Sequence, residues 1–271
     1  MGFGQSEFYM CGGSTPDMSD TDSGTLRTVE VSLGVVEAVA DLGGARVSEL
    51  AEHLDMPPST VHGHLATLHE RSYLAKEGDE YQIGLQFLNR GGHARHRKEG
   101  YRLAEEKVER LAERTGERVQ FVAEENGRGY YVHTAVGENA VLADARIGKR
   151  IYLHDSSAGK SIMAQLPEER VHEIVDRWGL PRFTEHTITD RETLFEELNE
   201  VRERGFALNR EETHEGLHAV GAAVETHEGQ VLGSFSVSGP SNRLKGDRFE
   251  SEIPDLLRGI TNELELRLSY S

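Results

Sequence analysis

The spacing of the apolar residues changes along the chain, and this change constrains the fold more than any other feature. Over most of the first 116 residues the apolar positions recur three or four apart, as over 47–54, which predicts amphipathic helices. From residue 119 they stand two apart, at Val119, Phe121 and Ala123, which is typical of a strand. The 271 residues therefore predict an α+β protein of one large or two modest domains.

Two helices are expected at the start of the first part. One covers 26–42 and is closed by Gly43-Gly44. Its apolar residues include Leu33, Val36 and Ala40, at helical spacing. The second covers 47–54, with Ser48 as its N-cap.

A third helix and a hairpin complete the first part. Asp55-Met56-Pro57 is expected to form a tight turn, and Pro58 suits the first turn of a helix. The expected buried stripe of that helix is Val61, Leu65 and Leu68. Two short strands are expected at 73–75 and 81–83, around a tip at Gly78-Asp79. Helix, helix, turn, helix and hairpin is the layout of a winged helix-turn-helix.

Composition divides the rest of the chain. The first 24 residues are polar and rich in Gly, Ser and Asp, which predicts a disordered tail with Met18 as an alternative start. The one cysteine, Cys11, lies there, which excludes an intrachain disulfide and fits a reducing cytoplasm. No apolar run approaches the ~18 residues that a membrane span needs. The predicted divisions are 1–24 as tail, 25–84 as winged helix-turn-helix, 85–116 as linker helix and 117–271 as the second domain.

The second domain is expected to mix strands with helices. Helices should follow Pro167 and Asp190 and end at Gly179 and Gly205, where glycine can adopt the left-handed conformation. A hairpin is expected over 220–237, and a last helix over about 249–268.

The charge balance is acidic, with 47 Asp and Glu against 30 Lys and Arg, and only six of the latter are lysine. An acidic, lysine-poor surface is typical of a protein kept soluble in concentrated salt, and an ordinary acidic protein is the alternative. Residues 25–90 hold five basic and ten acidic residues, whereas DNA-binding domains are usually basic. Concentrated salt screens phosphate attraction, so an acidic domain can still read DNA by base contacts.

Five ordered motifs resemble the IclR family of transcription regulators. They are Ser59–Val61, His154–Ser161, Arg204–Glu212, Gly216–Ala219 and Ser236–Pro240. The resemblance runs from about residue 26 to the C-terminus, and the acidic composition is similar to that of haloarchaeal members. It implies a winged helix-turn-helix, a linker helix that helps to pair subunits, and a profilin/GAF-like effector-binding domain with a largely antiparallel sheet.

The resemblance also implies partners. Family members act as homodimers or tetramers on double-stranded operator DNA, as repressors or activators, and respond to small carboxylates, aromatic acids or sugar-derived metabolites. A cytoplasmic regulator with no cofactor and no enzymatic activity is therefore expected.

The third helix carries the DNA-contact candidates. Short hydroxyl and imidazole side chains can bond base edges and phosphates, and a helix N-terminus offers amide donors. The predicted contacts are Arg46, Ser59, Thr60, His62, Gly63, His64, Thr67 and, in the wing, Lys76. Family members often carry an aromatic residue and an arginine where this chain has His62 and Gly63, so base preference does not transfer. A solvated helix face, in a ligand-binding protein that has lost DNA binding, is the alternative.

The resemblance places an effector pocket at the start of the helix after Ser156. Small residues there let a carboxylate approach backbone amides, where the helix dipole favours anions. The implied pocket residues are Ala143, Ser157, Ala158, Asn209, Leu217, Ala219, Ser236 and Ser238, with Asn209, Leu217 and Ala219 expected on a loop after Gly205. Asp is common where Asn209 stands and Cys where Ala219 stands, which leaves the effector open. The alternative is that these small residues only permit tight packing.

Two other strings need an interpretation. His214-Glu215-Gly216-Leu217-His218 matches the zinc-protease pattern and would make a metal-dependent hydrolase, but that chemistry needs a continuous helix, which Gly216 and the strand expected from Ala219 oppose. A non-catalytic metal held with Glu211 is a further possibility. The basic run 93–98 would either touch the DNA backbone or be a solvated charged segment.

Overall fold

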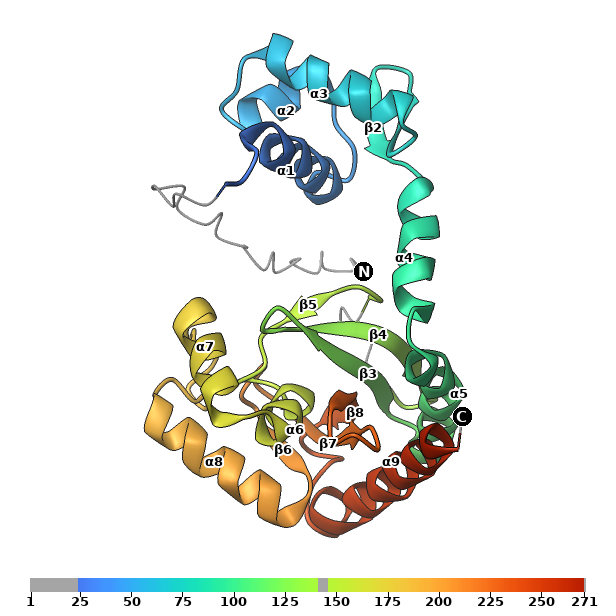
Figure 1. Cartoon of the computed structure of the whole chain (residues 1–271), viewed down its shortest axis with the longest axis vertical. Coiled ribbons are helices and arrows are strands. Elements are labelled where there is room, and N and C mark those ends of the chain that lie inside the picture. Colours follow the sequence, from blue (N-terminus) through green and yellow to red (C-terminus); the bar gives the residue numbers. More distant parts are fainter. Residues whose placement is uncertain (1–23, 141–145, 271) are drawn as a thin grey trace, which may run out of the picture. The chain divides into compact units, whose positions relative to one another are not determined.

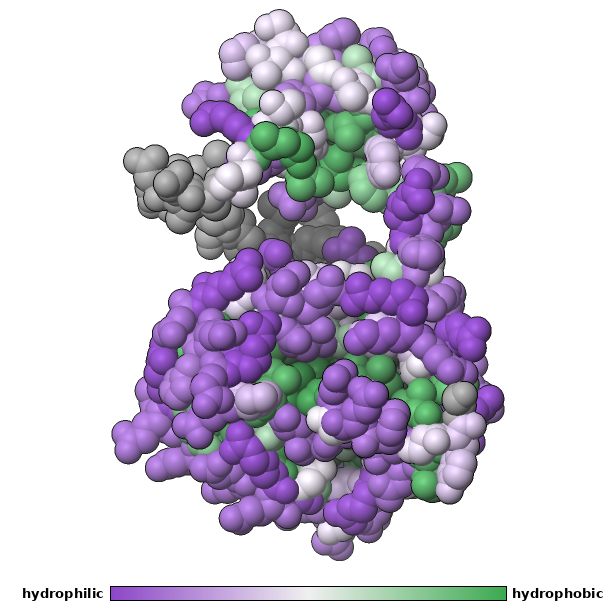
Figure 2. Space-filling model, viewed as in Figure 1, coloured by the Kyte–Doolittle hydropathy of each residue, from purple (hydrophilic) through white to green (hydrophobic). Residues whose placement is uncertain are grey.

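The computed structural model describes residues 24–140 and 146–270 and divides into two compact units, one ending at Leu88 and one starting at Asn89. The surface in view is mostly hydrophilic, in keeping with the 28% of residues that are charged (Figure 2). Within the described ranges, no helix is both long enough and apolar enough to cross a membrane.

The first unit has the predicted element order (Figure 1). Its elements are α1 (Arg27–Asp41), α2 (Val47–His53), α3 (Pro58–Glu70), β1 (Leu74–Glu77) and β2 (Glu80–Ile83). The hairpin β1–β2, which we call the wing, is tied to the helices because Ala45 and Tyr81 exchange two backbone hydrogen bonds of 3.1 and 2.8 Å. This arrangement is a winged helix-turn-helix.

The core side of α1 is not the side that Leu33, Val36 and Ala40 mark. The core takes Val35, Ala38 and Val39, whereas Leu33 is 57% exposed. Apolar residues lie on two sides of this helix, and spacing alone does not say which side meets α2 and α3.

The predicted N-cap of α2 is also wrong. The helix begins at Val47, with Arg46 as the N-cap residue in place of Ser48. The Glu49 carboxylate accepts a 2.7 Å hydrogen bond from the Arg46 N–H. A side chain three residues into the helix thus satisfies the backbone donor, and no hydroxyl is needed at the cap.

The region predicted as one linker helix holds two helices, α4 (Gln86–His96) and α5 (Glu99–Thr115). The helix α5 packs against the second unit's core through Tyr101, Ala104, Val108 and Leu111, and it ends as predicted at Gly116, whose φ of 70° is left-handed. Its apolar stripe makes α5 part of the second unit's core.

The second unit is built on a six-stranded sheet in the order β5-β4-β3-β8-β7-β6, and every neighbouring pair is antiparallel. The strands are β3 (Arg118–Glu125), β4 (Arg128–Val136), β5 (Arg150–Ile151), β6 (Ala207–Arg210), β7 (Leu217–Glu225) and β8 (Val231–Pro240). The predicted hairpin over 220–237 is β7–β8, and the antiparallel sheet is as expected.

Helices cover both faces of this sheet (Figure 1). Its apolar face, with Phe121, Val220 and Phe235, packs against α5 and α9 (Ile253–Ser269), which follows a π-helical turn at Arg248–Glu252. The other face meets α6 (Ser157–Gln165). The last two helices, α7 (Glu168–Trp178) and α8 (Arg191–Arg204), pack on α6 and end at Gly179 and Gly205 as predicted.

Candidate functional sites

The helix α3 presents a small polar surface on the side away from its core. Val61 and Leu65 are fully buried. The residues exposed on the other side include Ser59, Thr60, His62, Gly63 and Thr67. Pro58 at the helix start fixes the backbone there without needing an N–H partner. Hydroxyl and imidazole side chains of this kind can hydrogen-bond to base edges.

His64 differs from the other predicted contacts on α3. Its side chain is half-buried, and Nδ1 lies 2.8 Å from the Ser32 hydroxyl oxygen on α1. The imidazole therefore links α3 to α1, and the prediction that it points outward is wrong. Thr67 is exposed, but its hydroxyl donates a 2.9 Å hydrogen bond to the Gly63 carbonyl, which orients its methyl group and oxygen.

The two predicted cationic contacts lie outside α3. The Arg46 Nε atom is 3.8 Å from a Glu80 carboxylate oxygen, and both side chains are about half exposed. The ammonium group of Lys76 lies 5.4 Å from the centre of the Tyr81 ring. Acidic residues at the wing reduce its positive potential. Any binding of DNA at the wing would therefore depend on geometry more than on net charge.

The second candidate site lies on the sheet face opposite the apolar core. Cross-strand pairing puts Ser238 beside Arg118 on one side and Ala219 on the other, and Ser236 beside Gln120. We call the face that carries Arg118, Gln120, Thr134, Ser236 and Ser238 the polar sheet face.

The start of α6 packs tightly on this face. Ser156 caps the helix by accepting a 3.1 Å hydrogen bond from the Gly159 N–H, and the Ser157 hydroxyl is 3.0 Å from that of Ser236. A Cβ at Gly221 would lie 2.5 Å from the Ser157 carbonyl carbon, so only glycine allows this approach. Ser157 and the adjacent Ala158 are almost fully buried. This packing agrees with the alternative interpretation, in which these small residues only permit close contact.

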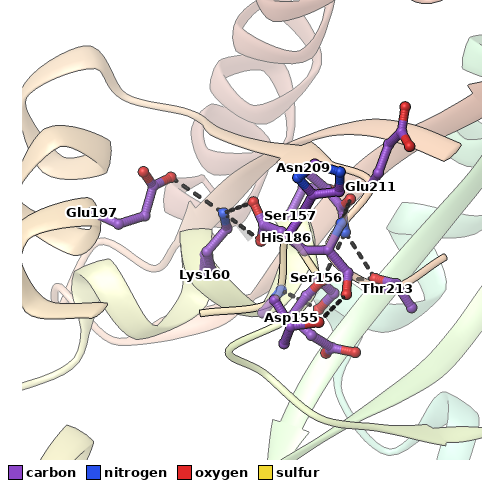
Figure 3. A network of polar contacts seen from close by, with 12 residues as sticks. Asp155, Ser156, Ser157, Lys160, His186, Glu197, Asn209, Glu211 and Thr213 are labelled. Carbon is purple, nitrogen blue, oxygen red and sulfur yellow. Dashed lines mark hydrogen bonds and ion pairs between the residues drawn. The ribbon is translucent and has the colours of Figure 1, made fainter. Parts of the chain in front are cut away.

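Asn209 is fully engaged in hydrogen bonds within the protein (Figure 3). Its side-chain nitrogen donates to the Asp155 carbonyl and the Thr213 hydroxyl, at 2.7 Å each. Its oxygen accepts from the Glu212 N–H at 3.1 Å. The expected loop is also wrong, because Asn209 lies on β6, and Leu217 and Ala219 lie on β7. Strand pairing satisfies their backbone groups, which a loop would leave to water.

Buried charges lie behind the start of α6. The Lys160 ammonium group is 2.7 Å from the Glu212 carboxylate and 3.3 Å from that of Glu197 (Figure 3). Asp155 is buried, and burial together with the nearby Glu212 raises its pKa to about 7. One Asp155 carboxylate oxygen has no hydrogen-bond partner among the residues described. Burial has the opposite effect on a base, and it lowers the pKa of His154 to about 4.

The sequence interpretation missed three polar residues on the polar sheet face. The buried Arg118 donates from Nε to the Ser238 hydroxyl at 3.1 Å, and the Gln120 amide is 3.2 Å from the same oxygen. The Thr134 hydroxyl oxygen is buried without a hydrogen-bond partner in the described ranges. Polar residues at 118 and 120, alternating with Val119 and Phe121, were the available signal.

His214 lies near two basic residues, Lys149 and Arg118. Burial is the main cause that lowers the pKa of His214, and the charges of Lys149 and Arg118 lower it further. Lys149 and Arg118 therefore lie within electrostatic range of His214. Ala143, the remaining predicted pocket residue, lies outside the described residues.

The zinc-protease string does not form a helix. Gly216 adopts a left-handed turn with φ of 74°, and the chain then enters β7. The His218 Nδ1 atom is 2.6 Å from the Leu244 carbonyl oxygen, and its ring stacks on Phe249. No cluster of three metal-ligating side chains occurs at 24–140 or 146–270. The two imidazoles therefore do not share the helix face that this chemistry needs.

Comparison with known proteins gives relatives for both units. Residues 28–78 match the IclR helix-turn-helix domain, and residues 94–264 match the family of the bacterial transcriptional regulator IclR C-terminal domain. The chain is 32% identical to a probable HTH-type transcriptional regulator ArcR of Halobacterium salinarum, over 86% of this chain and 90% of that protein. It is 30% identical to the HTH-type transcriptional repressor AllR of Escherichia coli, over 89% and 91%.

Solved structures agree with these matches. The IclR protein of Thermotoga maritima superposes with a TM-score of 0.75 and 26% identity, over 90% of this chain and 99% of that one. A double mutant of the inducer-binding domain of the PobR transcription factor from Acinetobacter, in complex with 3-hydroxybenzoic acid, superposes over 60% of this chain and 96% of its own, with a TM-score of 0.56 and 26% identity. The winged helix-turn-helix, the six-stranded sheet and the matches along both units lead to one conclusion: the chain belongs to the IclR family of transcription regulators.

Proposed function

We propose that this regulator binds a two-fold symmetric operator through α3 and the wing, and that a small anionic effector at the polar sheet face changes its operator affinity. The observation that carries the DNA-binding part is the exposed polar surface of α3, with Ser59, Thr60 and His62 on the side opposite the buried Val61 and Leu65. Such side chains reach base edges without long flexible stems.

The DNA contacts are proposed to depend on shape and hydrogen bonds more than on charge. Only Arg46 and Lys76 among the proposed contacts are cationic, and Glu80 lies near the former. Few phosphates would therefore be neutralised, and the affinity should fall only gently with salt. The acidic composition and the similarity to a Halobacterium salinarum protein support action in the cytoplasm at high salt.

The effector is proposed to be a carboxylate that pairs with the buried Arg118 guanidinium beside Ser238. Arg118 carries the positive charge, and hydroxyl groups of Ser236 and Ser238 supply donors on the same face. The remaining pocket residues are proposed to be Ala143, Ser157, Ala158, Asn209, Leu217 and Ala219. The complex of the PobR double mutant with 3-hydroxybenzoic acid shows that an inducer-binding domain of this fold can hold an aromatic acid, which supports a small acid as the class of ligand.

Self-association is proposed to use α1. Leu26, Val29 and Leu33 stand three and four residues apart and are 71%, 51% and 57% exposed. An apolar stripe of this kind on a helix favours pairing with a second copy. A homodimer, or a tetramer of two dimers, would present two α3 helices to the operator.

Selection of duplexes from a random DNA library, in molar KCl, tests DNA binding. Thr60→Ala and His62→Ala should each weaken binding to the selected duplex by about 5- to 100-fold. His172→Ala, on α7 of the second unit, is the matched control and should bind as the unaltered protein does. If no duplex is selected while ligand binding persists, the protein is a ligand-binding protein without an operator.

Calorimetric titration tests the effector. Glyoxylate, pyruvate and 3-hydroxybenzoate are suitable probes, each beside its uncharged amide. At least one acid should bind, its amide should not, and Arg118→Met should weaken that binding about ten-fold or more. Equal binding of an acid and its amide would contradict the proposed role of Arg118.

A further inference from the structure

Arg95, in the last turn of α4, joins that turn to β4 and α5 within the second unit. Its Nε donates to the Val132 carbonyl at 3.1 Å and lies 3.2 Å from the Nδ1 atom of His133. Its Nη2 lies 2.6 Å from the same Nδ1 and donates to a Glu105 carboxylate oxygen on α5 at 2.5 Å. No α4 residue is buried, and within the described ranges no other α4 side chain hydrogen-bonds to the sheet. Arg95 is thus the α4 side chain that bonds the end of the helix to β4, while Arg97, which follows the helix, pairs with Glu125 of β3.

His133 is built to receive Arg95 in one protonation state. The ring is 1% exposed, and its Nε2 lies 2.6 Å from the Tyr101 carbonyl oxygen. A carbonyl only accepts, so Nε2 carries the proton and Nδ1 is left as the acceptor for Arg95. Burial, and then the charge of Arg95, lower the pKa of His133 to about 4, which keeps the ring neutral and the contact intact.

The strand that carries His133 has an irregularity at this point. Phe121 of β3 pairs with His133, but Val122 pairs with Tyr131, so Val132 is an extra residue without a partner in the register. Bulges of this kind bend a strand and are common next to functional sites. Arg95 binds the Val132 carbonyl, and so contacts the bulge itself.

The same strand also borders the polar sheet face. Thr134 follows His133, and successive side chains of a strand point to opposite faces. Thr134 pairs with Gln120, which in turn pairs with Ser236 of the proposed effector site. Its hydroxyl oxygen is buried and has no hydrogen-bond partner in the described part of the chain, so an occupant of the face could bond to it. Adjacent residues of β4 thus face the effector site and the linker contact.

We propose that Arg95 and His133 are positioning residues that transmit the state of the polar sheet face to α4. The inference rests on the proposed function, since it needs an effector at that face. A ligand that displaces Thr134 moves the bulge of β4, and with it the Val132 carbonyl and the His133 ring. Because Arg95 bonds to both, the last turn of α4 moves too.

A nitroxide on α4 tests the contact without DNA or effector. His93 is exposed on α4, and Cys11→Ser removes the single native thiol, so His93→Cys takes up one label. Arg95→Met should shorten the rotational correlation time of the label by about two-fold or more, and His133→Leu should do the same. The double variant Arg95→Met/His133→Leu should give the same correlation time as either single variant, because both substitutions break one contact. Arg258→Met, which breaks an exposed pair with Asp255 on α9, is the matched control.

Thr134→Leu tests transmission, with Thr134→Val as a milder variant if the first unfolds. Either should change the label spectrum when Arg95 is present and leave it unchanged with Arg95→Met. On the selected duplex, the same substitution should change affinity by about three-fold or more only when Arg95 is present. Circular dichroism and thermal unfolding show whether each variant keeps its fold.

Three results would each overturn the inference. The first is a label whose rotational correlation time does not change with Arg95→Met, and the second is a label spectrum that neither Thr134 variant changes. The third is an effect of a Thr134 substitution on the label spectrum that is still present with Arg95→Met. Failure to select any duplex would count against operator binding instead, because the label measurements do not use DNA.

Discussion

Replacing Lys160 by methionine should destabilise the second unit by ~3–5 kcal/mol, the usual cost of removing one partner from a buried ion pair. Lys160 is 1% exposed, and the Glu212 and Glu197 side chains that it contacts are 10% and 20% exposed. Methionine keeps the length and apolar contacts of the lysine stem, so the loss should come from the charge. For a unit of this size the midpoint of thermal unfolding should fall by roughly 6–20 °C.

The loss of stability in Lys160→Met should depend on pH. Burial raises the pKa of Glu212, and Lys160 opposes that rise, so the variant raises it further. A carboxyl whose pKa is higher in the folded state contributes stability below its unfolded pKa and loses it as pH rises through the folded pKa. The loss in Lys160→Met should therefore be smaller at pH 5 than at pH 8.

Denaturant unfolding followed by the fluorescence of Trp178, the single tryptophan, measures this loss. Trp178 lies on α7, so its signal reports the second unit. Adding Glu212→Gln to Lys160→Met removes the uncompensated charge and should restore much of the stability at pH 8. A deficit under ~1 kcal/mol, or the same deficit at both pH values, would refute the assignment of a buried ion pair.

Three further predictions follow from single positions. Because burial raises the pKa of Asp155 to about 7, Asp155→Asn should stabilise the protein at pH 8 and not at pH 5, and calorimetric midpoints that shift equally would contradict this. A Cβ at Gly159 would lie 2.2 Å from the Leu153 carbonyl oxygen, so Gly159→Ala should cost about 1–3 kcal/mol in denaturant unfolding, whereas Gly259→Ala, with open space around it, should cost nothing. Leu33→Glu on the exposed stripe of α1 should lower the mass measured by sedimentation while the circular dichroism spectrum stays unchanged; an unchanged mass would exclude that stripe from self-association.

The sequence alone determined the elements whose signals are local. Pro58 starts α3, Gly116 ends α5, and Gly179 and Gly205 end α7 and α8, because proline and glycine restrict or free the backbone of their own residue whatever surrounds them. The order of these elements, together with the motifs, was enough to predict the winged helix-turn-helix and the family.

Tertiary structure decided what depends on residues far apart in the chain. Arg118 meets Ser238 only because β3 pairs with β8, and Arg95 meets His133, 38 residues further along the chain, only because the end of α4 lies beside β4. Likewise, packing against α2 and α3 determines which side of α1 is buried, and it brings His64 into contact with Ser32. Spacing along a helix or strand fixes which residues share a face, but the register and packing that bring two faces together arise from the whole chain.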